Sequence, residues 1–101
     1  MDLSGPWYIL EGEPGEHLVL EVLGQRLSGI WTSEALAQGF LARHAELGMR
    51  VSALETRALK EAFLRALRML KVDGVLGDYE PGAHRARMAR VEGLLEEVRH
   101  A

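Results

Sequence analysis

Four basic residues close together near the end of the chain have the residue types of an anion-binding site. They are His84, Arg85, Arg87 and Arg90, and the apolar spacing that follows them predicts a helix beginning near Ala83. The first backbone N–H groups of a helix have no partner within it, and a guanidinium group binds phosphate or carboxylate through two parallel hydrogen bonds. The arrangement predicts a site for a small anion or a phosphate-bearing metabolite, in a binding protein or an enzyme.

The same four residues have a second interpretation, in which they bind no ligand. Cations at the start of a helix are unfavourable by about 0.3–1 kcal/mol each, so they require negative charge nearby. Asp73, Asp78 and Glu80 precede the cluster closely in the sequence and are able to supply that charge. Neutralisation by these acids and recruitment of an external anion are both open from the sequence.

No other group of residues has the pattern of a catalytic, metal or cofactor site. The chain has no cysteine, and its four histidines, His17, His44, His84 and His100, are isolated from one another, so their spacing predicts no metal site. None of the serines stands in a Gly-x-Ser-x-Gly context, and the glycines form neither the dinucleotide motif nor the phosphate-loop motif. The sequence therefore assigns no catalytic residue, no metal and no cofactor, and it favours a protein that is not an enzyme.

The charge balance narrows the range of partners. The 101 residues carry a formal net charge of −3, which argues against nonspecific binding of nucleic acid. The predicted second helix nevertheless has a basic exposed side, formed by Arg57, Lys60, Arg65, Arg68 and Lys71. This side is either a solvated surface or a contact for an acidic protein partner.

The composition favours a cytoplasmic protein without membrane contact. The first residues have neither the basic nor the apolar segment of a secretory signal, and there is no run of about 18 apolar residues. Asparagine is absent, glutamine is scarce and nearly all basic residues are arginine, which is typical of a thermophile. A GC-rich genome produces the same bias towards arginine and alanine.

The alternation of apolar and polar residues predicts a single α+β domain over residues 1–101. We expect the order β-β-β-α-β-α-β-α, with a mixed, mostly antiparallel sheet of about five strands packed with three helices. Strands are expected at residues 7–10, 17–23, 26–31, 49–54 and 74–77, the second and third joined by a Gly24–Gln25 turn. Helices are expected at residues 33–47, from residue 53 or 56 to about 70, and from 83 almost to the end.

The second helix has two possible starts and one apolar face. Ser52 and Glu55 form a capping box that would start it at Ala53, whereas Thr56 is a cap further along the chain. The apolar stripe that should cover the sheet consists of Leu59, Phe63, Ala66, Leu67 and Leu70.

The strands carry more apolar surface than one helix layer covers. Leu18, Leu20 and Val22 lie on one face of their strand, while Val19 and Leu23 share the other, so the second face needs helices or another subunit to cover it. We therefore expect a noncatalytic protein-interaction domain that forms a homodimer. The residues expected at the interface are Trp7, Tyr8, Val19, Leu23 and Trp31, although the aromatic ones are equally suited to a core.

Several short segments also carry a resemblance to a known family. They are residues 31–35, which lead into a helix with Phe40 and Leu41, residues 48–51 with Leu54, the helix around Leu59, and residues 72–75. Their order resembles the N-terminal domains of SseB-like proteins and the small uncharacterised α/β proteins of thermophilic bacteria, over about residues 7–78. The resemblance implies a compact, often dimeric α/β domain with no established catalytic residues. Residues 77–79 and the long arginine-rich last helix depart from the pattern.

Overall fold

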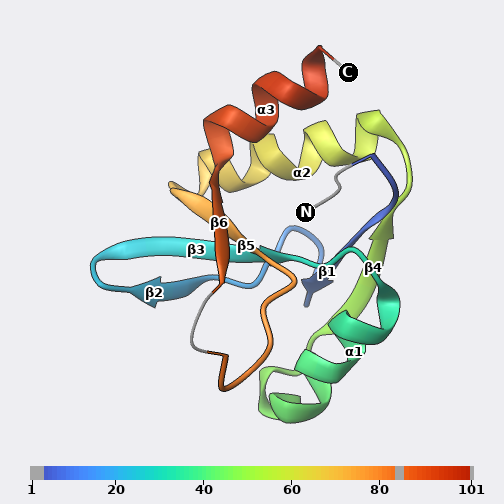
Figure 1. Cartoon of the computed structure of the whole chain (residues 1–101), viewed down its shortest axis with the longest axis vertical. Coiled ribbons are helices and arrows are strands. Elements are labelled where there is room, and N and C mark those ends of the chain that lie inside the picture. The colour runs from blue at the N-terminus through green and yellow to red at the C-terminus, as the bar shows by residue number, and fades with distance from the viewer. Residues whose placement is uncertain (1–3, 84–85, 101) are drawn as a thin grey trace.

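The computed structural model describes residues 4–83 and 86–100, which form an α+β fold with two sheets (Figure 1). One sheet pairs β1 (Trp7–Glu11) antiparallel with β4 (Arg50–Leu54). The other has the order β2 (Leu20–Val22), β3 (Gln25–Ile30), β5 (Gly74–Gly77) and β6 (Arg87–Arg90), in which only β3 and β5 are parallel. The helices are α1 (Glu34–Arg43), α2 (Arg57–Met69) and α3 (Val91–Arg99), and a short 3-10 helix, η1 (Ala45–Leu47), follows α1. The predicted α+β class and mostly antiparallel pairing are confirmed.

The last part of the chain differs from the prediction. Residues 87–90 form β6, which pairs antiparallel with β5, and α3 begins only at Val91. The predicted helix start at Ala83 is therefore wrong, and the described residues contain six strands in two sheets instead of about five in one. The sequence of β6 alternates well enough for a strand, but its pairing partner lies in a distant segment, so local periodicity did not distinguish strand from helix.

Side-chain caps fix the starts of the first two helices. The Ser33 hydroxyl accepts a hydrogen bond from the Leu36 N–H at 3.1 Å, and the Thr56 hydroxyl accepts one from the Leu59 N–H at 3.1 Å. Thr56 is thus the cap of α2, and the alternative start at Ala53 is wrong because that residue belongs to β4. The predicted first helix, which extended to residue 47, ends as an α-helix at Arg43.

The β2–β3 hairpin is confirmed, but its turn lies one residue earlier than predicted. Leu23 and Gly24 occupy the turn, with φ angles of 51° and 82°. Positive φ at both central residues is the geometry of a type I′ turn, whose twist matches that of the flanking strands. Glycine adopts this backbone without strain, whereas leucine does not.

Two apolar cores lie on different sides of the structure. The larger one joins Trp7, Ile30 and Val75 to the inner faces of α2 and α3, and the smaller one gathers Trp31 and Phe40 beneath α1. A single chain therefore covers most of the apolar strand surface through two separate helix layers.

The face that α2 buries is displaced from the predicted stripe. Lys60, Phe63, Leu64 and Leu67 are buried, whereas Leu59 is 47% exposed and Leu70 is 40% exposed. The position of a lysine on the inner face is the reason, because its aliphatic stem packs as an apolar group while its ammonium finds polar partners. A hydrophobic pattern treats lysine as a polar residue. The apolar stripe predicted for α2 is therefore rotated around the helix axis relative to the face that is buried.

Gly93 in α3 allows a direct test of the helix assignment. A Cβ built at Gly93 meets nothing within 4 Å, so alanine fits there without a clash. We expect Gly93→Ala to raise the free energy of unfolding by about 0.5–1 kcal/mol, because glycine has more backbone freedom to lose in a helix. Urea denaturation followed by circular dichroism measures the change.

The matched control is the same replacement at Gly48. This residue has a φ of 63°, in the left-handed region that disfavours a Cβ. Gly48→Ala is expected to lower the free energy of unfolding by about 1 kcal/mol or more. A loss of stability in Gly93→Ala would contradict the helical conformation at that position.

Candidate interaction surface

Two of the four residues predicted to bind an anion lie on a strand. Arg87 and Arg90 are exposed residues of β6, and only Arg90 adjoins the first turn of α3. His84 and Arg85 lie outside the described residues. The predicted placement of the cluster within the first turns of a helix is therefore wrong for both described arginines.

In the described residues, two of the three acids of the alternative interpretation, Asp73 and Asp78, bind other groups than Arg87 and Arg90. The Asp73 carboxylate accepts a hydrogen bond from the Arg26 backbone N–H at 2.9 Å. The Asp78 carboxylate accepts hydrogen bonds from the backbone N–H and the hydroxyl of Thr32. Within residues 4–83 and 86–100, neither described arginine of the cluster forms an ion pair.

The structure separates the five predicted interface residues by burial. Trp7 is 0% exposed and Trp31 is 1% exposed in one chain, so neither indole has surface to offer a partner and both assignments are wrong. Tyr8 and Val19 are partly buried against the two cores. Leu23 alone of the five is fully exposed, at 100%.

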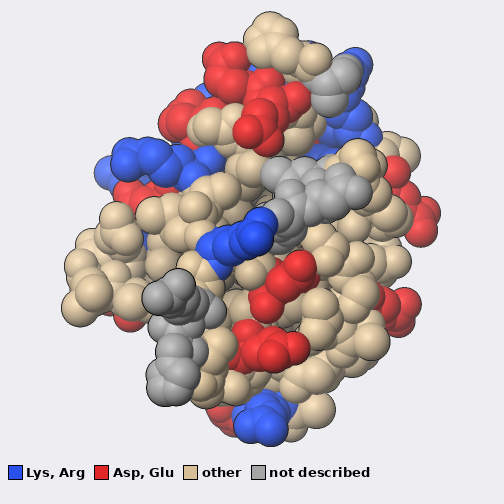
Figure 2. All heavy atoms as spheres, viewed as in Figure 1, with Lys and Arg blue, Asp and Glu red and all other residues tan. Residues whose placement is uncertain are grey.

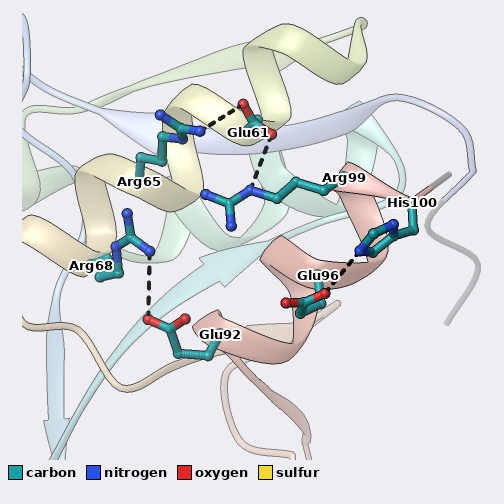
Figure 3. Close-up of polar contacts among 7 residues, drawn as sticks. All are labelled: Glu61, Arg65, Arg68, Glu92, Glu96, Arg99 and His100. Carbon is teal, nitrogen blue, oxygen red and sulfur yellow. Dashed lines mark ion pairs between the residues drawn. The ribbon is translucent and has the colours of Figure 1, made fainter.

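The basic side of α2 is smaller than predicted, because α3 packs beside it (Figure 3). Lys60 is buried rather than exposed. The Glu61 carboxylate forms ion pairs with Arg65 at 3.3 Å and with Arg99 of α3 at 3.5 Å. Arg68 lies 4.0 Å from the carboxylate of Glu92 in α3. These contacts reduce the charge available to an acidic partner, and the predicted contact with such a partner stays a prediction.

Exposed apolar side chains gather instead at the outer end of the four-stranded sheet. Val22 is 43% exposed, Leu23 is 100% exposed and Met88 is 44% exposed. We call these three residues the hairpin-end surface. Leu23 forms the tip of the β2–β3 hairpin, and uncharged atoms dominate that end of the molecule at the left of Figure 2.

The sheet geometry makes this surface continuous. Leu27 on β3 is paired with Gly74 on β5, and a Cβ placed on Gly74 would lie 3.5 Å from Leu27 Cδ2 and 2.9 Å from Met88 Sδ. Leu27 and Met88 thus both lie over a glycine that leaves room for them. Val22 points to the same face, because it is two residues from Leu20, the partner of Leu27. This face is opposite the one that Ile30 and Val75 present to α2 and α3.

Leu23 is unfavourable in this position for an isolated chain. A left-handed backbone costs a residue with a Cβ about 1–2 kcal/mol, and Leu23 has no buried contact that offsets it. Asparagine and glycine are the residues normally found at such a turn. Sequence reasoning placed Leu23 at an interface but not Val22 or Met88. Met88 lies in the segment that was predicted to be the last helix, and the structure places it on β6.

The surface also borders the two open edges of the sheet. β2 and β6 are the outer strands, so each has one side of its backbone without a strand partner in the described residues. Such edges attract further strands unless charges or side chains prevent it. Arg87 and Arg90 supply charge along β6, whereas Glu21 is the one charged residue of β2.

The fold and surface define a small α+β domain with an exposed apolar sheet face. Residues 4–95 match the family described as protein of unknown function (DUF3234), and the chain belongs to that family. A search of curated proteins found no match. The resemblance to SseB-like domains is not addressed by the family match and stays a prediction.

None of the helices in residues 4–83 and 86–100 is long and apolar enough to cross a membrane. In the same part of the chain, no group of three or more His, Asp or Glu side chains is arranged to hold a metal ion.

Proposed function

We propose that this protein is a noncatalytic interaction domain that forms a homodimer through the hairpin-end surface. The observation that carries the proposal is Leu23, a fully exposed leucine held in a left-handed turn at the tip of a hairpin. Burial of a leucine side chain is worth about 1.5–3 kcal/mol, which is enough to offset the backbone strain once a partner covers it.

A second copy is the partner that suits this surface best. In a two-fold interface the same patch contacts itself, so an apolar patch free of like charges is self-complementary. Val22 and its cross-strand neighbour Gln25 are uncharged on the open face, whereas the charged pair Glu21 and Arg26 points to the other face. Two copies packed through this face bring no like charges of the hairpin into opposition.

The test is sedimentation equilibrium of the full chain and of Leu23→Asn over micromolar to millimolar concentrations. We expect the wild-type chain to dimerise and the variant to have a dissociation constant at least about tenfold higher, because a symmetric dimer contains two copies of the lost contact. Asparagine tolerates the left-handed backbone, so the variant should unfold at the same temperature as wild type or above it.

Leu59→Gln is the matched control for the loss of an exposed leucine. Leu59 is 47% exposed on α2, away from the hairpin, and glutamine is a good helix former. This variant should dimerise as wild type does. A wild-type chain that remains monomeric up to millimolar concentration would refute the proposal, as would equal weakening by both variants.

The predicted cytoplasmic location and thermophilic origin belong with this proposal as further expectations. They rest on the composition and on the scarcity of thermolabile side chains.

A further inference from the structure

The strand β6 leaves one side of its backbone open. In the described residues it pairs with β5 alone, at one end of the four-stranded sheet (Figure 1). The Val91 N–H donates to the Asp73 carbonyl at 3.1 Å, one residue beyond the paired segment. Hydrogen-bonded pairs alternate along antiparallel strands. The N–H and C=O of Met88 and the N–H of Arg90 therefore point away from β5, to the open side.

Two arginines make this edge positively charged. Arg87 and Arg90 are exposed, and in the described part of the chain neither forms an ion pair. Asp73 and Asp78 flank β5, but their carboxylates accept hydrogen bonds from backbone and hydroxyl groups. The Glu92 carboxylate, at the start of α3, lies 4.0 Å from an arginine of α2. The edge thus keeps two cations that a partner is able to bind.

The two arginines lie on opposite faces of the sheet. Side chains alternate along a strand, and Arg87 and Arg90 are three residues apart. A further strand beside β6 would place its own residues directly opposite, so acidic residues three positions apart would meet both cations. Met88 lies between them and is 44% exposed, so an apolar residue suits the position opposite it.

We infer that the open edge of β6 binds an acidic, extended segment of a partner protein, which joins the sheet as a further strand. Backbone hydrogen bonds hold such a segment, and the two arginines select its charge. A second copy of β6 fits poorly, because arginines of both copies would lie side by side and like charges across a strand pair are unfavourable. The inference uses the backbone of β6 and does not depend on dimerisation.

An end-blocked, fluorescent peptide with the sequence Thr-Glu-Thr-Val-Glu-Thr tests this inference on the full chain. Paired antiparallel, it places glutamates opposite Arg90 and Arg87 and valine opposite Met88. Fluorescence anisotropy should give a dissociation constant below about 1 mM. The peptide with glutamine at both glutamates should bind about fivefold more weakly. No binding up to about 1 mM overturns the inference and leaves the arginines only the role of preventing edge pairing. Equal or tighter binding of a single-stranded DNA hexamer overturns it as well.

Two N-methylated forms of the peptide test strand addition itself. In the paired strand, the valine N–H points towards β6 and the N–H of the central threonine points away. Methylation of the valine nitrogen should abolish binding, because it removes a donor and blocks close approach of the strands. Methylation of the threonine nitrogen should leave binding within about twofold. Equal binding of the two forms would mean that charge alone holds the peptide, and the inference would be wrong.

Two replacements of Arg90 separate its charge from its backbone N–H. The φ of Arg90 is −76°, close to the value that proline fixes, and its N–H is not bonded to β5, so proline fits there. Arg90→Gln should weaken peptide binding about two- to fivefold. Arg90→Pro should weaken it about tenfold, because an edge donor is lost as well. Both variants should melt at the wild-type temperature, and equal binding by the two would contradict strand addition.

Arg43→Gln is the matched control for the loss of charge. Arg43 is an exposed arginine in the last turn of α1, outside β6. This variant should bind the peptide as wild type does. If Arg43→Gln and Arg90→Gln weaken binding equally, the peptide responds to the net charge of the protein and does not occupy the edge of β6.

Discussion

Asp78→Ala is expected to lower the free energy of unfolding by about 3 kcal/mol, because two hydrogen bonds to a charged group are lost at once. The Asp78 carboxylate accepts from the Thr32 backbone N–H at 2.7 Å and from the Thr32 hydroxyl at 2.8 Å, both partly buried. Alanine leaves these donors without their acceptor. The substitution also strains the backbone. Residue 78 has a φ of 49°, and alanine tolerates this left-handed conformation less well than aspartate does.

The effect is large because this contact joins two distant segments. The Asp78 N–H donates to the Ile30 carbonyl at 2.9 Å, and the Trp31 indole N–H donates to the Tyr79 carbonyl at 2.9 Å. These bonds connect the end of β5 to the segment between β3 and α1, where Trp31 is buried in the smaller core. For a domain of this size, about 3 kcal/mol corresponds to a fall in melting temperature of about 12–24 °C.

Asp78→Asn is the control that separates hydrogen bonding from backbone strain. Asparagine tolerates the left-handed conformation and keeps an acceptor oxygen for the Thr32 N–H, so the expected loss is about 1 kcal/mol. Urea denaturation measures both variants. If Asp78→Ala is as stable as wild type, or if the two variants lose the same amount, the contact does not hold these segments together.

Much of the fold follows from local signals that the structure confirms. Ser33 and Thr56 begin helices because their hydroxyls satisfy backbone N–H groups that the helix itself leaves unpaired. The strand at residues 74–77 is short and apolar, and it stands at the centre of the larger sheet. Such signals lie within a few residues of one another, so the sequence displays them directly.

The wrong predictions concern secondary structure and burial that depend on contacts between distant parts of the sequence. Residues 87–90 form a strand because they pair with the edge of β5. No residue close to them in the sequence indicates that this edge is there. From the sequence, Trp7 and Trp31 suited either a core or an interface. In the structure, Trp7 is buried in the core that includes α2, and Trp31 is buried in the core that includes α1. Lys60 was predicted to lie at the surface because it is charged. Its long aliphatic stem nevertheless packs well in an apolar core.

The candidate sites were correspondingly less predictable than the fold. Leu23 is the one residue of the hairpin-end surface that was predicted to lie at an interface, because the strand pattern left its face without a helix layer to cover it. Val22 and Met88 become neighbours on one sheet face only after β6 joins β5. A site assembled by packing leaves no periodic trace in the chain.

Gly74→Ala should destabilise the protein by about 2–3 kcal/mol, because the new methyl group overpacks a contact with backbone. The added Cβ would lie 2.8 Å from the Ala89 carbonyl oxygen and 2.9 Å from Met88 Sδ. The Met88 side chain is able to turn away, but the carbonyl oxygen belongs to β6 and moves only with its strand. Urea denaturation measures the loss of stability, and hydrogen exchange of the β6 amides should show selective loss of protection.

Gly93→Ala is the matched control, because it is the same change at a position with no neighbouring atom within 4 Å. The two variants should therefore change stability in opposite directions. Since Met88 belongs to the hairpin-end surface and rests above Gly74, the methyl group at Gly74 should also weaken dimerisation, whereas Gly93→Ala should not. A stable Gly74→Ala variant with protected β6 amides would mean that β6 does not approach β5 as closely as this pairing requires.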